Sequence, residues 1–141
     1  MRRADILREA RKLLGVPFKL EGRNPTTGLD CAGLVICVAQ AFGCFRGLDY
    51  RPHSSPSTSG AFPAAVQRET QRIPAASAKP GDILYLSFKG MRAAHVAIVS
   101  ALSPLRVIHA GDMTEKVIEA PLNARLKQFI VCAYQFRGLK D

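Results

Sequence analysis

The first third of the chain carries hydrophobic residues at helical spacing. Apolar positions recur three and four residues apart over residues 4–14, which predicts an amphipathic helix that ends before Gly15 and Pro17. A second apolar segment, from Cys31 to about Phe42, has almost no polar face. We expect a buried helix there, with Asp30 as its N-cap.

Glycine, proline and serine interrupt the chain around these helices. Residues 20–29 predict a loop, and residues 46–63 predict a long surface loop because proline and serine recur along them. A short helix from Ala64 to Arg72 is expected to follow.

From residue 79 onward the pattern changes to short apolar runs bounded by turn residues, the first turn being Lys79-Pro80-Gly81-Asp82. Five strands are expected, at Ile83–Phe88, His95–Ala101, Leu105–Ala110, Glu115–Ala120 and Phe129–Phe136. Their connections are too short for crossover helices, so the strands should pair antiparallel. Helices followed by strands predict an α+β fold, with N-terminal helices packed on a sheet of about five antiparallel strands.

Composition fits one globular domain spanning residues 1–141, since 48% of the residues are hydrophobic and 22% are charged. The longest apolar run, residues 31–39, is far shorter than the roughly 20 residues that span a bilayer. No apolar segment of signal-peptide length follows the basic N-terminus. We therefore expect no membrane insertion, and a chain that stays in the cytoplasm or leaves by lysis or within a particle.

The formal net charge of +9 favours anionic partners, such as nucleic acid, an acidic cell-wall polymer or an acidic surface. Lys and Arg are scattered, however, without a run of five or a nucleic-acid motif. We expect a solvated basic surface and no specific nucleic acid partner.

The four cysteines, at positions 31, 37, 44 and 132, form no C-x-x-C pair. We therefore expect neither a metal site nor a disulfide framework. Cys37 and Cys44 are seven residues apart on an apolar segment, which fits two small core residues on one helix face.

Cys31 stands where the glycine-rich loop turns into the buried helix. The peptide dipoles at a helix start favour a thiolate, so this is a position for a nucleophile. A cysteine hydrolase also needs a base and a group that orients the base. Histidine suits the role of base because it titrates near neutral pH.

His95 opens one predicted strand and His109 closes the next. A hairpin about Ser103-Pro104 would bring both imidazoles to one end of the sheet, and the helix of Cys31 must pack on that sheet. This arrangement makes Cys31 the nucleophile, His95 the general base and acid, and His109 the orienting group. The backbone N–H of Cys31 would help to stabilise an oxyanion.

Spacing alone leaves other roles open. Cys31 also fits a core cysteine, and a histidine at a strand end also fits a surface or hydrogen-bonded residue. Asp112 is another candidate for orienting a histidine, although its place after a glycine suits a turn. His53 lies in the long loop and receives no role.

Five segments occur in an order that resembles the NlpC/P60 family, from about Ala4 to Phe136: Gly15–Phe18, Gly28–Val35, Lys79–Leu84, His95–Val99 and Val107–Ala110. The resemblance implies a papain-like fold and a cysteine peptidase that needs no metal or cofactor. It also implies that Cys31 is the nucleophile, His95 the base and His109 the third polar residue. The implied substrates are amide bonds of peptidoglycan stem peptides, often between D-γ-glutamyl and a diamino acid.

Phe18 and Asp30 are the candidate substrate-binding residues. Phe18 stands where many members of the family have a tyrosine whose hydroxyl lies near the nucleophile. Losing such a donor costs roughly 10²–10³ in rate unless another group replaces it. Ala32 likewise replaces a usual serine, and the loop at 46–63 is long for the family.

The lack of a signal or wall-binding repeat resembles the small stand-alone versions encoded with phage tails and gene-transfer particles. That resemblance implies tail-like proteins as partners and action at the cell wall. Two alternatives stay open: a weak or inactive tail or wall-binding module on the same fold, and an acyltransferase that uses the same three residues.

Overall fold

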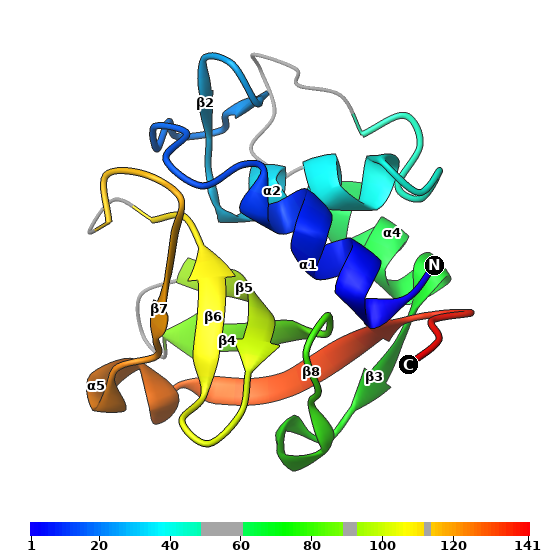
Figure 1. Cartoon of the computed structure of the whole chain (residues 1–141), viewed down its shortest axis with the longest axis vertical. Helices are drawn as coiled ribbons and strands as arrows, with labels where there is room; N and C mark the ends of the chain where they lie inside the picture. Colours follow the sequence, from blue (N-terminus) through cyan, green and yellow to red (C-terminus); the bar gives the residue numbers. More distant parts are fainter. Residues whose placement is uncertain (49–60, 89–92, 112–113) are drawn as a thin grey trace.

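The structure is a computed structural model that describes residues 1–48, 61–88, 93–111 and 114–141, and its three longest helices lie on one side of an antiparallel sheet (Figure 1). The predicted loop at 46–63, with His53, and the candidate Asp112 lie wholly or mostly outside these residues. The helices are α1 (Arg3–Arg11), α2 (Cys31–Gln40), α4 (Ala61–Glu69), α5 (Ala124–Lys127) and the 3₁₀ helix η1 (Ala75–Ser77).

The main sheet has six strands in the order β3-β8-β4-β5-β6-β7. They are β3 (Thr70–Ile73), β4 (Ile83–Phe88), β5 (Ala93–Ala101), β6 (Arg106–His109), β7 (Ile118–Pro121) and β8 (Ile130–Phe136). Every neighbouring pair in this sheet is antiparallel, which confirms the predicted fold class.

The extra strand corrects two predictions, the number of strands and the helix at Ala64–Arg72. That helix starts at Ala61 and ends at Glu69, and Thr70–Ile73 then pairs with β8, with Thr70 opposite Phe136. This pairing joins residues that are far apart in sequence, so no local hydrophobic pattern predicts it.

The helix that begins at Cys31 confirms its predicted cap and burial. The Asp30 side chain accepts a hydrogen bond from the Gly33 N–H at 2.7 Å, and seven of the ten residues of α2 are buried. The helix ends at Gln40 rather than Phe42, and Gly43, with a positive φ of 76°, then reverses the chain. The predicted loop before it contains a small hairpin of β1 (Arg23–Asn24) and β2 (Gly28–Leu29).

The core lies on both sides of the sheet. On the helix side, α1 and α2 pack against apolar residues of β4, β5 and β6, including Ile83, Val96, Ile98 and Ile108. The opposite face carries a smaller cluster around Leu84, Leu86, Ala97 and Val99. Both faces of β5 are therefore filled, which holds this strand firmly in place.

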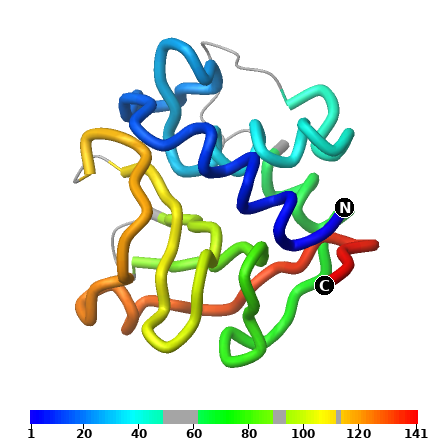
Figure 2. Tube along the Cα trace, viewed as in Figure 1, coloured from blue at the N-terminus to red at the C-terminus, as the bar shows by residue number. Residues whose placement is uncertain are grey.

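The two ends of the chain meet beside α1, as the trace in Figure 2 shows. The Arg3 N–H donates to the Lys140 carbonyl at 3.0 Å, and the Arg3 guanidinium bonds Asp141 at 2.7 Å. The same guanidinium reaches Asp82, at the entry to β4, at 2.9 Å, where the carboxylate has no exposed surface. One arginine thus joins both termini to the start of a central strand.

Within the described ranges, no helix combines the length and the apolar character needed to cross a membrane.

Candidate active site

The two predicted histidines meet at one end of the β5–β6 hairpin. The strands pair antiparallel, with Ile98 opposite Ile108. The His95 Nε2 and His109 Nδ1 atoms lie 2.8 Å apart, and the two rings meet edge to face at an angle of 72°. The structure therefore brings together the predicted base and the predicted orienting group.

His109 is buried, and burial lowers the pKa of its imidazole because the interior disfavours the charged form. A neutral His109 can accept the Nε2–H of His95 through its Nδ1 atom. In that arrangement the opposite nitrogen of His95, Nδ1, is the atom able to take up a proton. With His109 as the acceptor, the contact orients His95 and leaves its Nδ1 atom free of the shared proton.

Cys31 is the first residue of α2, and this helix packs on β5. The backbone N–H groups of Val96 and Ala32 lie near enough to its sulfur to lower the pKa of the thiol. Val96 directly follows His95 in β5, so the thiol lies against the strand that carries the predicted base.

The pKa of the Cys31 thiol shifts in the direction opposite to the expectation based on the helix start. Burial raises the pKa of the Cys31 thiol, and the Asp30 carboxylate raises it further. The N–H groups of Val96 and Ala32 and the Arg23 guanidinium lower it, but burial outweighs them. Burial thus opposes the thiolate that the helix start favours, and the reactive form of Cys31 stays a prediction.

The start of α2 also offers a backbone donor. Among the residues that the structure describes, the Cys31 N–H has no hydrogen-bond acceptor, as is usual in the first turn of a helix. An N–H in this position is suited to stabilise a negative oxygen next to the sulfur.

The Asp30 carboxylate is engaged inside the protein. Besides the Gly33 N–H, it accepts from the Glu21 N–H at 3.1 Å and forms an ion pair with Arg23 at 2.5 Å. The structure therefore shows Asp30 holding the start of α2, while its contact with a substrate stays a prediction.

Phe18 is half-buried at the edge of the core, and its backbone is tied to the segment before Cys31. Its N–H donates to the Glu115 carbonyl at 2.9 Å, and it forms a bridge with Leu29, two residues before Cys31. The ring carries no hydroxyl, and its role at the site stays a prediction.

Sequence reasoning missed two parts of this site, Arg23 and the close approach of Gly22 to Gly33. A Cβ atom on Gly33 would lie 2.1 Å from the Gly22 carbonyl oxygen, so only glycine fits there. A glycine inside an otherwise apolar helix is a signal for such close packing, whereas Arg23 has no local signal.

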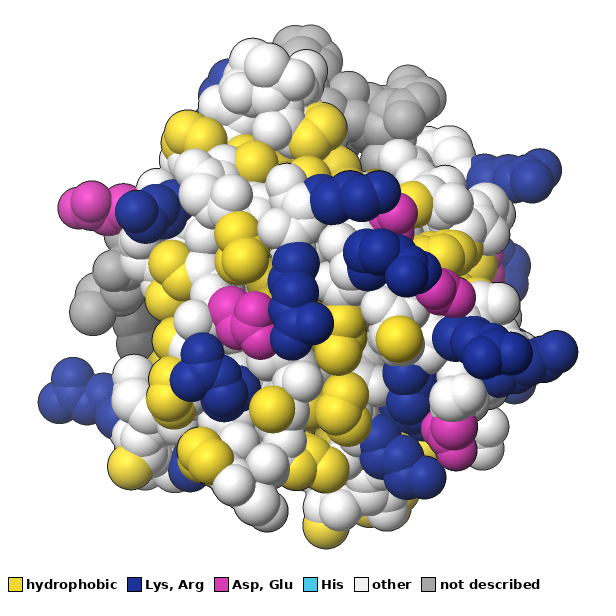
Figure 3. Space-filling view, in the orientation of Figure 1, with side chains coloured by type: hydrophobic (Ala, Val, Ile, Leu, Met, Phe, Trp, Pro, Cys, Tyr) yellow, Lys and Arg dark blue, Asp and Glu magenta, His cyan; other side chains and the backbone are white. Residues whose placement is uncertain are grey.

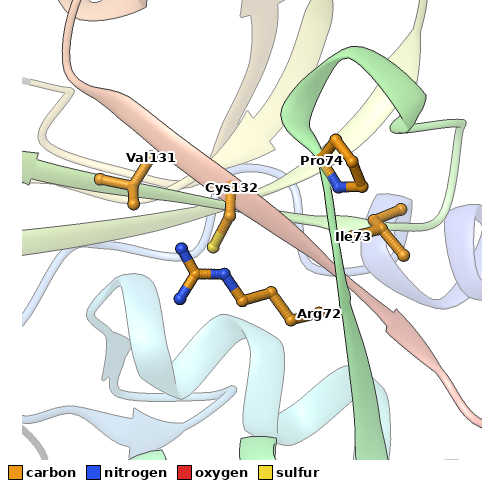
Figure 4. Close-up of a pocket in the computed structure, with 5 residues that line it drawn as sticks. All are labelled: Arg72, Ile73, Pro74, Val131 and Cys132. Carbon is orange, nitrogen blue, oxygen red and sulfur yellow. The ribbon is translucent and has the colours of Figure 1, made fainter.

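A hollow of about 370 Å³ lies where β3 ends alongside β8 (Figure 4). Its lining residues are Arg72, Ile73, Pro74, Val131 and Cys132, so it holds none of the predicted catalytic residues.

The other three cysteines lie in different environments. Cys132 is buried, whereas Cys37 and Cys44 are half-buried. Cys44 lies beyond the end of α2, so the predicted shared helix face is wrong, and none of the four cysteines forms a disulfide.

Basic side chains are spread over the face in Figure 3 and alternate with acidic ones. Arg11 pairs with Glu119, and Lys12 pairs with Glu9. This distribution agrees with the solvated basic surface expected from the sequence.

A cysteine at the start of a buried helix, packed on an antiparallel sheet that pairs two histidines, defines an α+β domain of papain-like architecture. The chain belongs to the NlpC/P60 family, which matches residues 15–134. The comparison confirms the resemblance inferred from the sequence.

The chain matches about a sixth of the length of two curated relatives. The chain is 37% identical over 93 residues to the probable endopeptidase p60 of Listeria welshimeri and 32% identical over 83 residues to the γ-DL-glutamyl hydrolase of Bacillus subtilis. The aligned regions are 66% and 58% of this chain but only 15% and 17% of those proteins. The crystal structure of the NlpC/p60 domain of the peptidoglycan hydrolase SagA is 26% identical, with a TM-score of 0.63, covering 96% of this chain and 100% of that one.

Proposed function

We propose that this chain is a cysteine peptidase that hydrolyses amide bonds in peptidoglycan stem peptides. The observation that carries the proposal is the 2.8 Å contact between His95 and His109 on the strand that contacts the Cys31 thiol. The names of two similar proteins, a peptidoglycan hydrolase and a γ-DL-glutamyl hydrolase, support this substrate class.

In the proposed reaction, His95 Nδ1 removes the thiol proton as the Cys31 sulfur attacks the amide carbon. A carbon–sulfur bond forms, and the carbonyl oxygen becomes an oxyanion that the Cys31 N–H stabilises. His95 then gives its proton to the leaving amine, and the carbon–nitrogen bond breaks. Water attacks the thioester with His95 again as base, which releases the new carboxylic acid and restores the thiol.

The pKa directions suit this order of events. Because burial raises the pKa of Cys31, the proposal has proton transfer to His95 accompany attack on the substrate. Because burial lowers the pKa of His109, this residue stays neutral and can accept the Nε2–H of the protonated His95. A neutral acceptor in this position stabilises the imidazolium.

The preferred bond in this proposal joins a D-γ-glutamyl residue to a diamino acid, and the basic surface would attract such acidic peptides. The proposal includes action at the cell wall as part of a phage-tail-like particle, on the strength of the sequence resemblance to small stand-alone members.

The test incubates the wild-type chain with a purified stem peptide that contains the D-γ-glutamyl bond. New amino groups and the two fragment masses are expected, while the matched peptide with an L-α-glutamyl bond stays intact. With an added amine acceptor, hydrolysis is expected to remain the main reaction, and a dominant transfer product would favour an acyltransferase instead. Binding of the peptide without any cleavage would contradict the peptidase.

A second candidate, a wall-binding or tail module without turnover, is favoured by Phe18. If the missing hydroxyl limits catalysis, Phe18→Tyr is expected to raise kcat by about 10²-fold, since one oxyanion donor has that value. Phe18→Leu serves as the control that changes the ring without adding a donor. Measurable wild-type turnover that Phe18→Tyr leaves unchanged would show that another group completes the oxyanion site, and no turnover in either protein would favour the binding module.

A further inference from the structure

An ion pair lies directly before the first residue of α2. The Arg23 Nη1 atom lies 2.5 Å from Asp30 Oδ1 and donates to the Gly22 carbonyl at 2.8 Å. Only 7% of the Arg23 side chain and 11% of the Asp30 side chain are exposed. Such a pair must be well bonded on both sides, because a buried charge without its partner is costly.

The Asp30 carboxylate joins three segments at this point. It caps α2 through the Gly33 N–H, binds the loop through the Glu21 N–H and meets the guanidinium from β1. Serine or asparagine would cap a helix as well as aspartate does. A carboxylate differs from them by its negative charge, which lies beside the Cys31 thiol and opposes its ionisation.

We infer that Arg23 is a positioning residue for Cys31: its guanidinium holds the Asp30 cap and cancels the negative charge of that cap beside the nucleophile. The inference rests on the proposed function only in taking Cys31 as the nucleophile. It assigns to the β1–β2 hairpin the task of balancing charge at the start of α2.

The groups around Cys31 agree with this role. Asp30 raises the pKa of the thiol and Arg23 lowers it. Among the residues that the structure describes, His95 on β5 and His109 on β6 are titratable groups at this end of the sheet, and Cys37 lies one to two turns further along the helix. Arg23 also lowers the pKa of Cys37, which places the guanidinium along the side of α2.

The test measures how fast iodoacetamide modifies Cys31 in the full chain between about pH 6 and about pH 10, with peptide mass spectrometry to identify the thiol. Four proteins are compared: the wild type, Arg23→Gln, Asp30→Ser and the double variant. Serine keeps a capping oxygen while removing the charge. Arg125→Gln, at an exposed arginine of α5, is the control for loss of one positive charge elsewhere.

Arg23→Gln is expected to slow modification about tenfold at pH 7 while leaving the high-pH rate unchanged, which corresponds to one pH unit in the midpoint. Asp30→Ser is expected to move the midpoint in the opposite direction, and the double variant is expected to return close to the wild type. If Arg23 had a purely structural role, both single variants would change the rate of Cys31 modification in the same direction. The double variant would then depart further from the wild-type rate than either single variant.

Identical pH profiles of Cys31 modification for Arg23→Gln and the wild type would overturn the inference. A double variant whose midpoint does not return close to the wild-type value would overturn it as well. If Arg23→Gln does not fold, Arg23→Lys, which retains the charge, is expected to keep the wild-type midpoint, and a tenfold loss there would contradict charge balancing. Modification of Cys31 requires no turnover. Failure of the peptidase and failure of the Arg23 role are therefore separate results.

Discussion

Replacement of Cys31 by alanine is expected to lower hydrolysis of the D-γ-glutamyl stem peptide by roughly 10⁶-fold, to the uncatalysed background. The proposed acyl-enzyme forms on this sulfur, and nucleophile and base act as one unit, so removing the nucleophile removes nearly all of their effect. Alanine is a good helix former, so α2 should persist and circular dichroism should match the wild type. Release of new amino groups, followed over days for the variant, measures the loss.

Cys37→Ala and Cys44→Ala are the matched controls, because both thiols are half-buried like Cys31 and lie on or just after the same helix. Each is expected to keep activity within about threefold of the wild type, since neither thiol lies in the first turn of α2. Cleavage by Cys31→Ala at the wild-type rate would contradict the assigned nucleophile, and loss of activity in Cys37→Ala alone would move that role along α2.

His95→Ala is expected to have the second largest effect, lowering kcat by roughly 10³-fold or more. Burial raises the pKa of the Cys31 thiol, so we expect its attack to depend on a base. In the variant we expect the rate of hydrolysis to rise with pH, because hydroxide takes over the removal of the thiol proton from the missing imidazole. Initial rates across the pH range measure this slope.

His109 provides the graded control for that result. His109→Asn keeps an oxygen that can accept the Nε2–H of His95, so we expect a loss of only about tenfold. His109→Ala removes the acceptor and is expected to approach the loss of His95→Ala. Equal activity of His109→Ala and the wild type would show that the 2.8 Å contact has no part in the reaction.

The parts of the fold that sequence predicted depend on local signals. Asp30 caps α2 as predicted, because an aspartate before a long apolar run is a strong helix start. The strand at Ile83–Phe88 has its predicted bounds, because a proline–glycine turn marks its beginning. The contact between the two histidines was predictable, because two strand-like runs joined by a short turn favour an antiparallel hairpin.

The parts that sequence could not predict depend on contacts between distant segments. Strand β3 exists through its pairing with β8, and its residues Gln71 and Arg72 are exposed, so no apolar alternation marks it. The partner of Asp30 is seven residues away in a loop that looked irregular. The pKa of Cys31 has the opposite direction to the helix-start rule because the sheet buries the sulfur, and burial is a property of the folded chain.

Arg3 makes the buried carboxylate of Asp82 depend on the first residues of this chain. Termini are commonly where proteins tolerate trimming, fusion and proteolysis. Here loss of the first three residues would leave Asp82, a carboxylate with no exposed surface, without the cation that bonds it at the entry to β4. Six residues of β4 pair along β5 up to His95 and beyond, so the damage would reach the strand that carries His95. Removal of residues 1–3 is therefore expected to weaken the sheet beneath the proposed site without touching any of the three residues that the proposal uses.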